Sequence, residues 1–406
     1  MIRRTIYGLP FASYAVQNPT GAPARGACVM LHTFFRVSFG RVGLFVGLAL
    51  LLFVFSPQLY RLGDYTRQTN PFSGQRDVER AFEPTAQELA CLHGLNPDSP
   101  DSPDSSDKAE SNNSSSASIP NIAHFIFFQR LPLDHDGQGD FDFLGYLSVR
   151  SAIVSLKPEK VFFHYSYTSK DPSLFPKTGE DPLIENNQWI RRLKQNVELV
   201  RHNQPADNSL VHSEHLADTL RLDILLKYGG IYFDVDAFAL RPFHDVLLSP
   251  HPHDVVLGNE GSNRAGLCNA VMAARPNSNF IRRWRSTYEG ADLNKEWNYH
   301  SVIVPKKLAQ RYPQEVCELA PDGFFWPTWT WRHIQWMHEP IEEGEVQRCE
   351  RKMAETGGAL FDNQLAYHAW SQMARDRFLG RLTPTIVRRE ETRFNILMRR
   401  FLEDDV

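Results

Sequence analysis

Two carboxylates close an apolar stretch near the middle of the chain. Asp234 and Asp236 follow Ile231, Tyr232 and Phe233 directly, and a carboxylate is costly to bury without a positive partner. Side chains two apart on a strand share a face, so both carboxylates can point toward one ligand. Such a pair suits a hard divalent cation that completes its shell with phosphate oxygens. The spacing therefore predicts a site for a metal-bound diphosphate, which the metal stabilises as a leaving group.

The acidic pair is a weak signal by itself. The same D-x-D spacing occurs at Asp134–Asp136 and at Asp140–Asp142, both in a polar loop that contains glycine. What distinguishes the later pair is a preceding helical stretch with Asp218 and Arg221 on adjoining turns, a Gly-Gly stop and then an apolar strand. Asp218 and Arg221 alone would suit an ordinary i,i+3 surface pair. The acidic pair that follows favours a functional role for them.

Segments with strand and helix patterns alternate around this point. The predicted strands cover 119–129, 160–167, 196–202, 231–233, 254–260 and 268–276, and the predicted helices cover 144–156, 213–228 and 277–288. This alternation predicts an α/β fold with a mostly parallel central sheet and helices on both faces. In such sheets ligands bind beyond the carboxyl ends of the strands, which is where the aspartates follow strand 231–233.

These residues together resemble a known family. Asp218-x-x-Arg221, followed by YGGIYFDVD at 228–236, is similar to the signature of the family 32 glycosyltransferases, which have a DXD-containing sugar-binding region. That family includes fungal mannosyltransferases and α-1,4-galactosyltransferases. The resemblance covers roughly 119–284, with IPNIAHFIF similar to the opening strand and CNAVMAARPNSNF to a later strand that contains Asn. Residues 290–406 match less clearly.

The resemblance implies a GT-A fold and a retaining transfer of a hexose from GDP-mannose or a UDP-hexose, with Mn2+ or Mg2+. It implies that Asp236 binds the metal, that Asp234 binds the metal or the ribose, and that Asp218 and Arg221 bind hydroxyls of the donor sugar. A retaining reaction requires front-face attack or a covalent intermediate, and both stay open.

Three further residues receive roles from the same resemblance. Tyr232 is expected to pack near the nucleotide. Asn269 is expected to contact the sugar or the acceptor, with a turn at the end of a strand as the alternative. His368, in the segment AYHAW, is expected to contact the metal or the diphosphate, with a structural histidine as the alternative. The region 290–406 is expected to recognise the acceptor, a glycan or a glycolipid.

The N-terminal region predicts a membrane anchor. Residues 1–41 carry five arginines and no acidic residue, and an apolar run follows at 42–55. We predict a single transmembrane helix at 42–59, with a cytoplasmic tail before it and the rest of the chain in the lumen of the Golgi or the ER. The alternatives are a cleaved signal peptide, a mitochondrial presequence and a buried core helix.

The remaining chain divides into three parts. Residues 60–118 form a predicted stem, whose segment 94–118 is too polar to fold and carries N-x-S sequons at Asn112 and Asn113. Residues 119–385 form the predicted GT-A domain, and 386–406 form a helical tail. The four cysteines after residue 59 allow three disulfide pairings and suit an oxidising compartment.

Composition excludes some other functions. The net charge of −4 is mixed along the chain and supplies no basic field for nucleic acid, and the absence of C-x-x-C makes a structural zinc site improbable. Two rival classes are a catalytically silent relative that binds sugars or acts as a scaffold, and a metal-dependent phosphohydrolase. The intact set of Asp218, Arg221, Asp234 and Asp236 favours an active transferase over the silent relative, and a phosphohydrolase would require more converging ligands.

Overall fold

The structure is a computed structural model. It describes residues 47–48, 50–56, 78, 82–95, 118–133, 139–169, 171–177, 179, 181–203, 213–248, 253–291 and 298–406. The chain forms two compact units, Met1–Gly63 and Asp64–Val406, and the second unit holds the candidate site residues. Most of the predicted polar tether at 94–118, both sequons and the Asp134–Asp136 pair lie outside the described residues.

The membrane-spanning helix predicted at 42–59 was wrong. In that region the structure describes helical backbone at 47–48 and 50–56. None of the helices within the described ranges is long and apolar enough to cross a membrane. A spanning helix needs about 20 predominantly apolar residues, and the apolar run at 42–55 is shorter than that.

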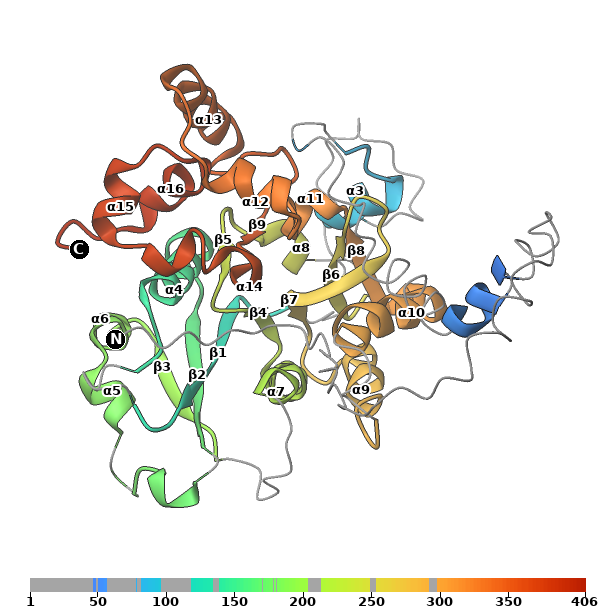
Figure 1. Cartoon of the computed structure of the whole chain (residues 1–406), viewed down its shortest axis with the longest axis horizontal. Coiled ribbons are helices and arrows are strands. Elements are labelled where there is room, and N and C mark those ends of the chain that lie inside the picture. Colours follow the sequence, from blue (N-terminus) through green and yellow to red (C-terminus); the bar gives the residue numbers. More distant parts are fainter. Residues whose placement is uncertain are drawn as a thin grey trace, which may run out of the picture. The chain divides into compact units, whose positions relative to one another are not determined.

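A central sheet organises the second unit (Figure 1). Within the described residues it has seven strands in the order β3-β2-β1-β4-β7-β6-β8. Their bounds are β1 (Ile122–Arg130), β2 (Lys160–Thr168), β3 (Glu198–Arg201), β4 (Gly230–Phe233), β6 (Val255–Glu260), β7 (Gly266–Ala274) and β8 (Val316–Leu319). Strand β7 is antiparallel to β4 and β6, and the other neighbouring pairs are parallel. The prediction of a mostly parallel sheet is confirmed.

A second, two-stranded sheet adjoins the first. It pairs β5 (Ala237–Ala239) with β9 (Ala366–His368) in antiparallel register, with Ala237 opposite His368, and β9 contacts β7 of the central sheet. The described α-helices are α3 (Ala86–Leu92), α4 (Phe143–Leu156), α5 (Pro182–Asn186), α6 (Gln188–Leu193), α7 (Ser213–Tyr228), α8 (His244–Leu247), α9 (Asn279–Ser286), α10 (Val304–Arg311), α11 (Pro321–Phe324), α12 (Trp331–His338), α13 (Glu343–Thr356), α14 (Ser371–Ala374), α15 (Pro384–Arg389) and α16 (Arg393–Met398). The predicted helices at 144–156, 213–228 and 277–288 correspond to α4, α7 and α9 and are confirmed.

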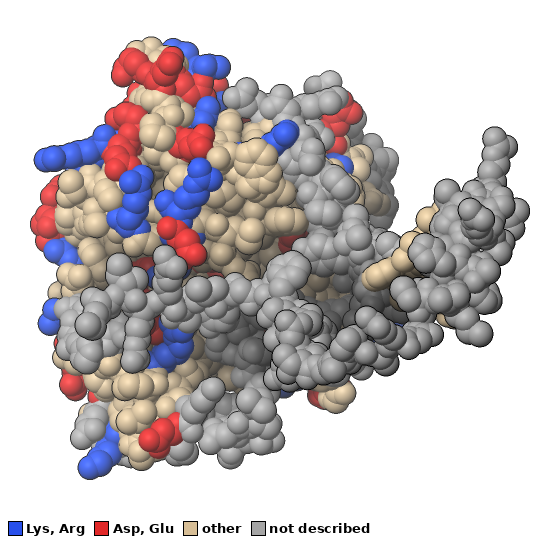
Figure 2. Space-filling view, in the orientation of Figure 1, with Lys and Arg blue, Asp and Glu red and all other residues tan. Residues whose placement is uncertain are grey.

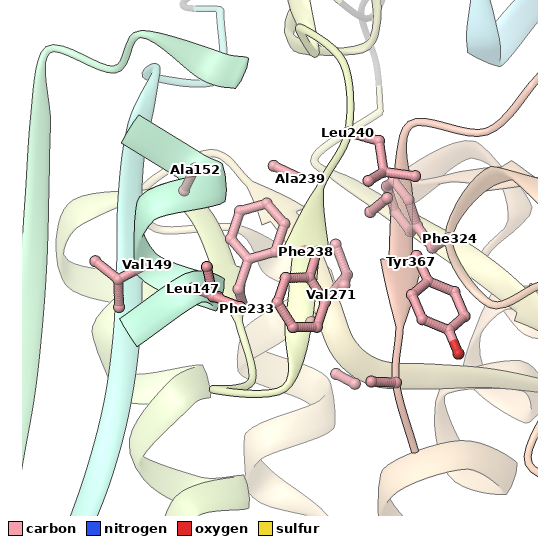
Figure 3. Close-up of a cluster of buried hydrophobic side chains, with 14 of the residues drawn as sticks. Leu147, Val149, Ala152, Phe233, Phe238, Ala239, Leu240, Val271, Phe324 and Tyr367 are labelled. Atoms are coloured by element: carbon pink, nitrogen blue, oxygen red, sulfur yellow. The ribbon is translucent and has the colours of Figure 1, made fainter. Parts of the chain in front are cut away.

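Hydrophobic clusters cover both faces of the sheet. Successive strand residues point to opposite faces, so Tyr232 packs in a cluster with residues of α7, α9 and α10, whereas Phe233 packs in a larger cluster with α4, β5 and β9. Figure 3 shows Phe233 and Phe238 beside Leu147 of α4. Burying one such side chain contributes about 1.5–3 kcal/mol. These clusters fix the end of β4, where the acidic pair begins.

The charged surface is mixed in sign. On the face shown in Figure 2, lysine and arginine side chains alternate with aspartate and glutamate side chains and do not form a large patch of one sign. Positive and negative side chains are therefore mixed on this face as they are along the sequence.

A disulfide joins Cys91 of α3 to Cys317 of β8, while Cys268 and Cys349 are buried free thiols. Each of the three pairings that the sequence allowed contains two disulfides, whereas the structure forms one bond and leaves the other two cysteines as thiols. The bond links residues 226 positions apart, so it restrains the unfolded chain strongly. It also ties part of the predicted stem to the edge of the central sheet.

Loss of this disulfide should destabilise the fold. Cys317→Ala is expected to lower the free energy of unfolding by about 2–4 kcal/mol, the usual contribution of such a bond. Urea unfolding with and without a thiol reductant checks this. The wild type and the control Cys349→Ala should both lose stability on reduction, whereas Cys317→Ala should not respond. A wild type that is indifferent to reductant would contradict the assignment.

Three histidines form a hydrogen-bonded row across the parallel strands. His124 Nδ1 lies 3.1 Å from His164 Nε2, and His164 Nδ1 lies 2.9 Å from His202 Nε2. His124 Nε2 lies 2.9 Å from the carbonyl oxygen of Gly229, which can only accept, so each ring donates toward Gly229. Burial lowers the pKa of His124 to about 4 and also lowers the pKa values of His164 and His202. The row is therefore neutral in the native protein at neutral pH.

The row should make the fold sensitive to acid. Between pH 6.5 and 4 the unfolded histidines bind protons that the native ones do not, so stability falls as pH falls, by up to about 1.4 kcal/mol per pH unit for each histidine. Urea midpoints at pH 7, 6 and 5 measure this. His164→Gln should reduce the slope, and His244→Gln, at an exposed position, should preserve it. Equal slopes in all three proteins would rule out the row as the cause.

Candidate metal and diphosphate site

The acidic pair lies in the turn between β4 and β5. The strand-like alternation that the sequence analysis applied to the two aspartates does not hold, because β4 ends at Phe233 and the Ala237 N–H donates to the Asp234 carbonyl over 2.9 Å. The turn directs the chain out of the central sheet toward β9. The predicted position at the carboxyl end of the buried strand is confirmed.

The pairing of β5 with β9 brings His368 to the pair. One ligand atom from each of Asp234, Asp236 and His368 lies within 4.8 Å of the other two. His368 Nε2 lies 3.1 Å from Asp236 Oδ1, and the Ser371 N–H donates to Asp236 Oδ2 over 2.8 Å. The predicted metal-binding residues therefore converge, although 132 positions separate Asp236 from His368.

Asp236 and His368 each stabilise the charged form of the other. Burial favours the neutral form of Asp236, but the charge of His368 and the hydrogen bonds from His368 and Ser371 outweigh burial and hold the pKa of Asp236 below its usual value. Burial likewise opposes a charge on His368, but the Asp236 carboxylate raises the pKa of His368. Asp236 is thus an anion at neutral pH, as a metal ligand must be.

The group fits a divalent cation. Two carboxylates and an imidazole are ligands that Mn2+ accepts, and Mg2+ also binds such carboxylates. His368 Nδ1 is buried and has no hydrogen-bond partner among the described residues. A buried polar atom of this kind is normally satisfied. Three protein ligands on one side leave the remaining coordination positions for phosphate oxygens.

A second group, built around Arg221, adjoins the first. Arg221 Nη1 lies 3.1 Å from Asp234 Oδ1, and Nη2 lies 3.3 Å from Asp218 Oδ1. Arg221 Nη1 also donates to the Asn269 carbonyl over 2.8 Å, and Asn269 Nδ2 donates to Asp218 Oδ1 over 2.7 Å. The sequence predicted a divalent metal as the positive partner of the aspartates, and the structure places a second, buried cation, Arg221, beside Asp234.

Tyr232 completes this group. Its hydroxyl donates to Asp234 Oδ1 over 2.6 Å, and the Arg221 guanidinium lies 4.7 Å from the centre of its ring. Burial raises the pKa of Asp234, and the Arg221 charge opposes that rise. Each predicted site residue therefore lies in one of two adjoining groups that share Asp234.

The other D-x-D pair within the described residues has structural partners. Asp142 caps the N-terminus of α4 by accepting from the Gly145 N–H, and it forms an ion pair with Arg375. Asp140 pairs with Arg130 at the surface. Local capping and surface pairing account for these two carboxylates.

Sequence reasoning missed residues around the site. Tyr288 lies close enough to Asp218 for that carboxylate, after burial, to raise its pKa. Glu260 ends β6, and Trp329 and Trp370 lie in the region rich in tryptophan after residue 290. A carboxylate at the end of an apolar strand was a visible signal for Glu260, because the same signal identified Asp234.

The chain is similar to known proteins over much of its length. Residues 148–253 match the family described as "Glycosyltransferase sugar-binding region containing DXD motif". The chain is 32% identical over 297 residues to glucan organizing enzyme 1 of Cryptococcus neoformans var. grubii, covering 70% of this chain and 71% of that protein. It is 24% identical over 210 residues to O-glycosyltransferase braB of Annulohypoxylon truncatum, covering 43% and 48%.

Two solved structures are also similar. The PaToxG glycosyltransferase aligns with a TM-score of 0.33 at 15% identity, covering 70% of this chain and 87% of that one. The glycosyltransferase GlyE of Streptococcus pneumoniae aligns in its apo form with a TM-score of 0.36 at 8% identity, covering 70% and 61%.

Proposed function

The chain belongs to the glycosyltransferases whose sugar-binding region contains a DXD motif, and we propose that it transfers a hexose from GDP-mannose or a UDP-hexose to a glycan or glycolipid acceptor. The family implies a divalent metal and a nucleotide-sugar donor. We propose Mn2+ or Mg2+ as the metal and retention at the transferred carbon. The observation that carries the proposal is the convergence of Asp234, Asp236 and His368 beside Arg221.

Each group has a distinct task in this proposal. Asp234, Asp236 and His368 hold the metal, and a bound divalent ion would neutralise the charge that develops on the departing diphosphate. Asp218 accepts hydrogen bonds from hydroxyls of the donor sugar. Arg221 holds Asp218 and Asp234 in position and balances their charge inside the protein.

In this proposal Asn269 and Tyr232 orient the residues that bind the donor and do not contact the donor themselves. The Asn269 amide orients Asp218, and its backbone carbonyl orients Arg221. The Tyr232 hydroxyl fixes one oxygen of Asp234 and thereby leaves the other oxygen for the metal or the ribose. Preorganised groups of this kind need little rearrangement during the reaction.

We also propose the oxidising lumen of the secretory pathway, the Golgi or the ER, as the place of action. The disulfide between Cys91 and Cys317 supports this, because such bonds persist in oxidising compartments and are rare in the cytosol.

A donor panel tests the function. The full chain is incubated with UDP- and GDP-hexoses, with Mn2+, with Mg2+ or with a chelator, and release of the nucleoside diphosphate is measured. One donor should be hydrolysed or transferred only when a divalent ion is present. If no donor binds or reacts, the chain is the catalytically silent relative that the sequence left as a rival.

A further inference from the structure

A carboxylate without an assigned role lies near the metal-binding group. Glu260 is the last residue of β6 and is partly exposed. The Trp329 indole donates to Glu260 Oε1 over 3.2 Å, and the Cys268 thiol also forms a hydrogen bond with the carboxylate. Glu260 lies outside the group of Asp234, Asp236 and His368 that could hold a cation within the described residues.

Glu260 is nevertheless close to that group. Its strand β6 pairs with β7, with Glu260 opposite Gly266, and β7 contacts β9, the strand that ends at His368. Burial raises the pKa of Glu260 itself, while Cys268, His368 and Trp329 oppose this rise. Because Glu260 is only partly buried, its carboxylate is accessible to a ligand that donates hydrogen bonds.

Two aromatic rings lie beside His368. The His368 ring lies 4.2 Å from the ring of Trp370 and 6.2 Å from that of Phe325, measured between centroids. A Cβ at Gly258, two residues before Glu260, would approach the Phe325 ring to 2.9 Å. Because Gly258 has no Cβ, the Phe325 ring can pack against the end of β6.

One tryptophan of the same segment is exposed. Trp331 follows Trp329 by two residues at the start of α12, and its exposed fraction is 64%. Helix α12 contacts α14, whose first residue is Ser371, the donor to Asp236. An exposed indole thus lies two positions along the chain from Trp329, which donates to Glu260, and on a helix that contacts α14.

Sugars present two kinds of surface that match these residues. Their hydroxyls donate hydrogen bonds to a carboxylate, and a bond to a charged acceptor is among the stronger ones. Their C–H faces are apolar, and aromatic side chains line ligand sites that bind such faces. A carboxylate with a nearby exposed indole, beside a donor site, therefore suits a second sugar.

We propose that Glu260 and Trp331 bind the acceptor sugar, with Glu260 accepting a hydrogen bond from an acceptor hydroxyl and Trp331 packing against the C–H face of the same or the next sugar. This inference rests on the proposed transferase function and adds the residues of its acceptor side. Trp329 positions the Glu260 carboxylate.

The experiment separates hydrolysis from transfer. With the donor and metal that the wild type uses, nucleoside diphosphate release is measured in water alone and with methyl mannoside, methyl glucoside, methyl galactoside, mannobiose, laminaribiose and lactose. Release without sugar reports hydrolysis, and the increase on adding sugar reports transfer. Glu260→Gln should lower transfer about 10- to 100-fold, as expected for a lost hydrogen bond to a charged group, and should leave hydrolysis and nucleoside diphosphate binding within about twofold. Glu355→Gln, at an exposed position of α13, is the matched control.

Trp331 provides a second, independent test. Trp331→Ala, an exposed change, should raise the KM for the sugar about tenfold with little effect on hydrolysis, as expected for a lost aromatic contact. Sugar binding should change the tryptophan fluorescence of the wild type, and Trp331→Phe should remove most of that change.

Three results would overturn the inference. Hydrolysis and transfer that fall together in Glu260→Gln would place Glu260 on the donor side. Unchanged transfer in both variants would remove these residues from the acceptor site. A wild type that hydrolyses its donor but responds to no sugar, in rate or in fluorescence, would show that no such subsite exists. If the wild type neither binds nor hydrolyses any donor, the proposed function itself fails.

Discussion

Asp236→Asn should lower the rate of metal-dependent donor turnover by at least about 10³-fold, which corresponds to about 4 kcal/mol of lost transition-state stabilisation. Asparagine keeps the size of the side chain and can still accept from the Ser371 N–H, but it removes the negative charge that a divalent cation requires. The measurement is nucleoside diphosphate release at several Mn2+ concentrations. The metal concentration for half-maximal rate should rise as well.

Asp140→Asn is the matched control for that change. Asp140 belongs to a D-x-D pair with the same spacing, but it forms a surface ion pair with Arg130, which typically contributes only about 0–1 kcal/mol. Its turnover and metal dependence should equal those of the wild type. If Asp236→Asn kept a tenth of the activity with an unchanged metal dependence, Asp236 would not be a metal ligand.

The elements of the fold were predictable because their signals are local. Strand β4 and helix α7 each carry their apolar pattern within a few residues of sequence, and the Gly-Gly stop lies between them. The spacing from Asp218 to Asp236 has the same origin, since one helix, one turn and one strand fix it. Local pattern and the family resemblance together were therefore enough to predict that Asp218, Arg221, Asp234 and Asp236 lie near one another.

Contacts between distant segments were not predictable in this way. His368 reaches Asp236 only because β9 pairs with β5, and no periodicity in either three-residue strand encodes that pairing. The disulfide partner of Cys91 depends on where α3 packs, which the spacing of cysteines does not specify. Glu260 was visible as a carboxylate at a strand end, but its link to Trp329 spans 69 positions.

The predicted transmembrane helix failed for a different reason. The run at 42–55 is apolar enough for a membrane span but too short, and length decides whether a helix can cross a bilayer. The turn at Asp234 shows a similar limit. Alternation of side chains along a strand was extended to Asp236, three residues beyond Phe233, where the backbone has already left the sheet.

Arg221→Met should destabilise the protein and abolish donor turnover together. The Arg221 side chain is 6% exposed and lies between Asp218 and Asp234, so its removal leaves the buried Asp218 and the partly buried Asp234 without this cation. Breaking a buried pair in this way typically costs about 3–5 kcal/mol. Urea unfolding measures the loss, and nucleoside diphosphate release measures the activity. Arg221→Lys restores the charge but not the planar fork that reaches both carboxylates. Its stability should therefore lie between those of the wild type and Arg221→Met.

The pH dependence of this loss tests its cause. Burial and the neighbouring Asp236 carboxylate already raise the native pKa of Asp234, and Arg221 opposes that rise, so loss of Arg221 should raise the pKa of Asp234 further above its unfolded value. Native protein then binds more protons than unfolded protein, so acidification stabilises the variant relative to the wild type, and the difference between them should shrink from pH 7.5 to pH 5. Arg285→Met removes a partly exposed partner of Asp223 and should cost about 0–1 kcal/mol at both pH values. A deficit for Arg221→Met that stays constant with pH would mean that lost packing, and not unpaired charge, makes Arg221 necessary.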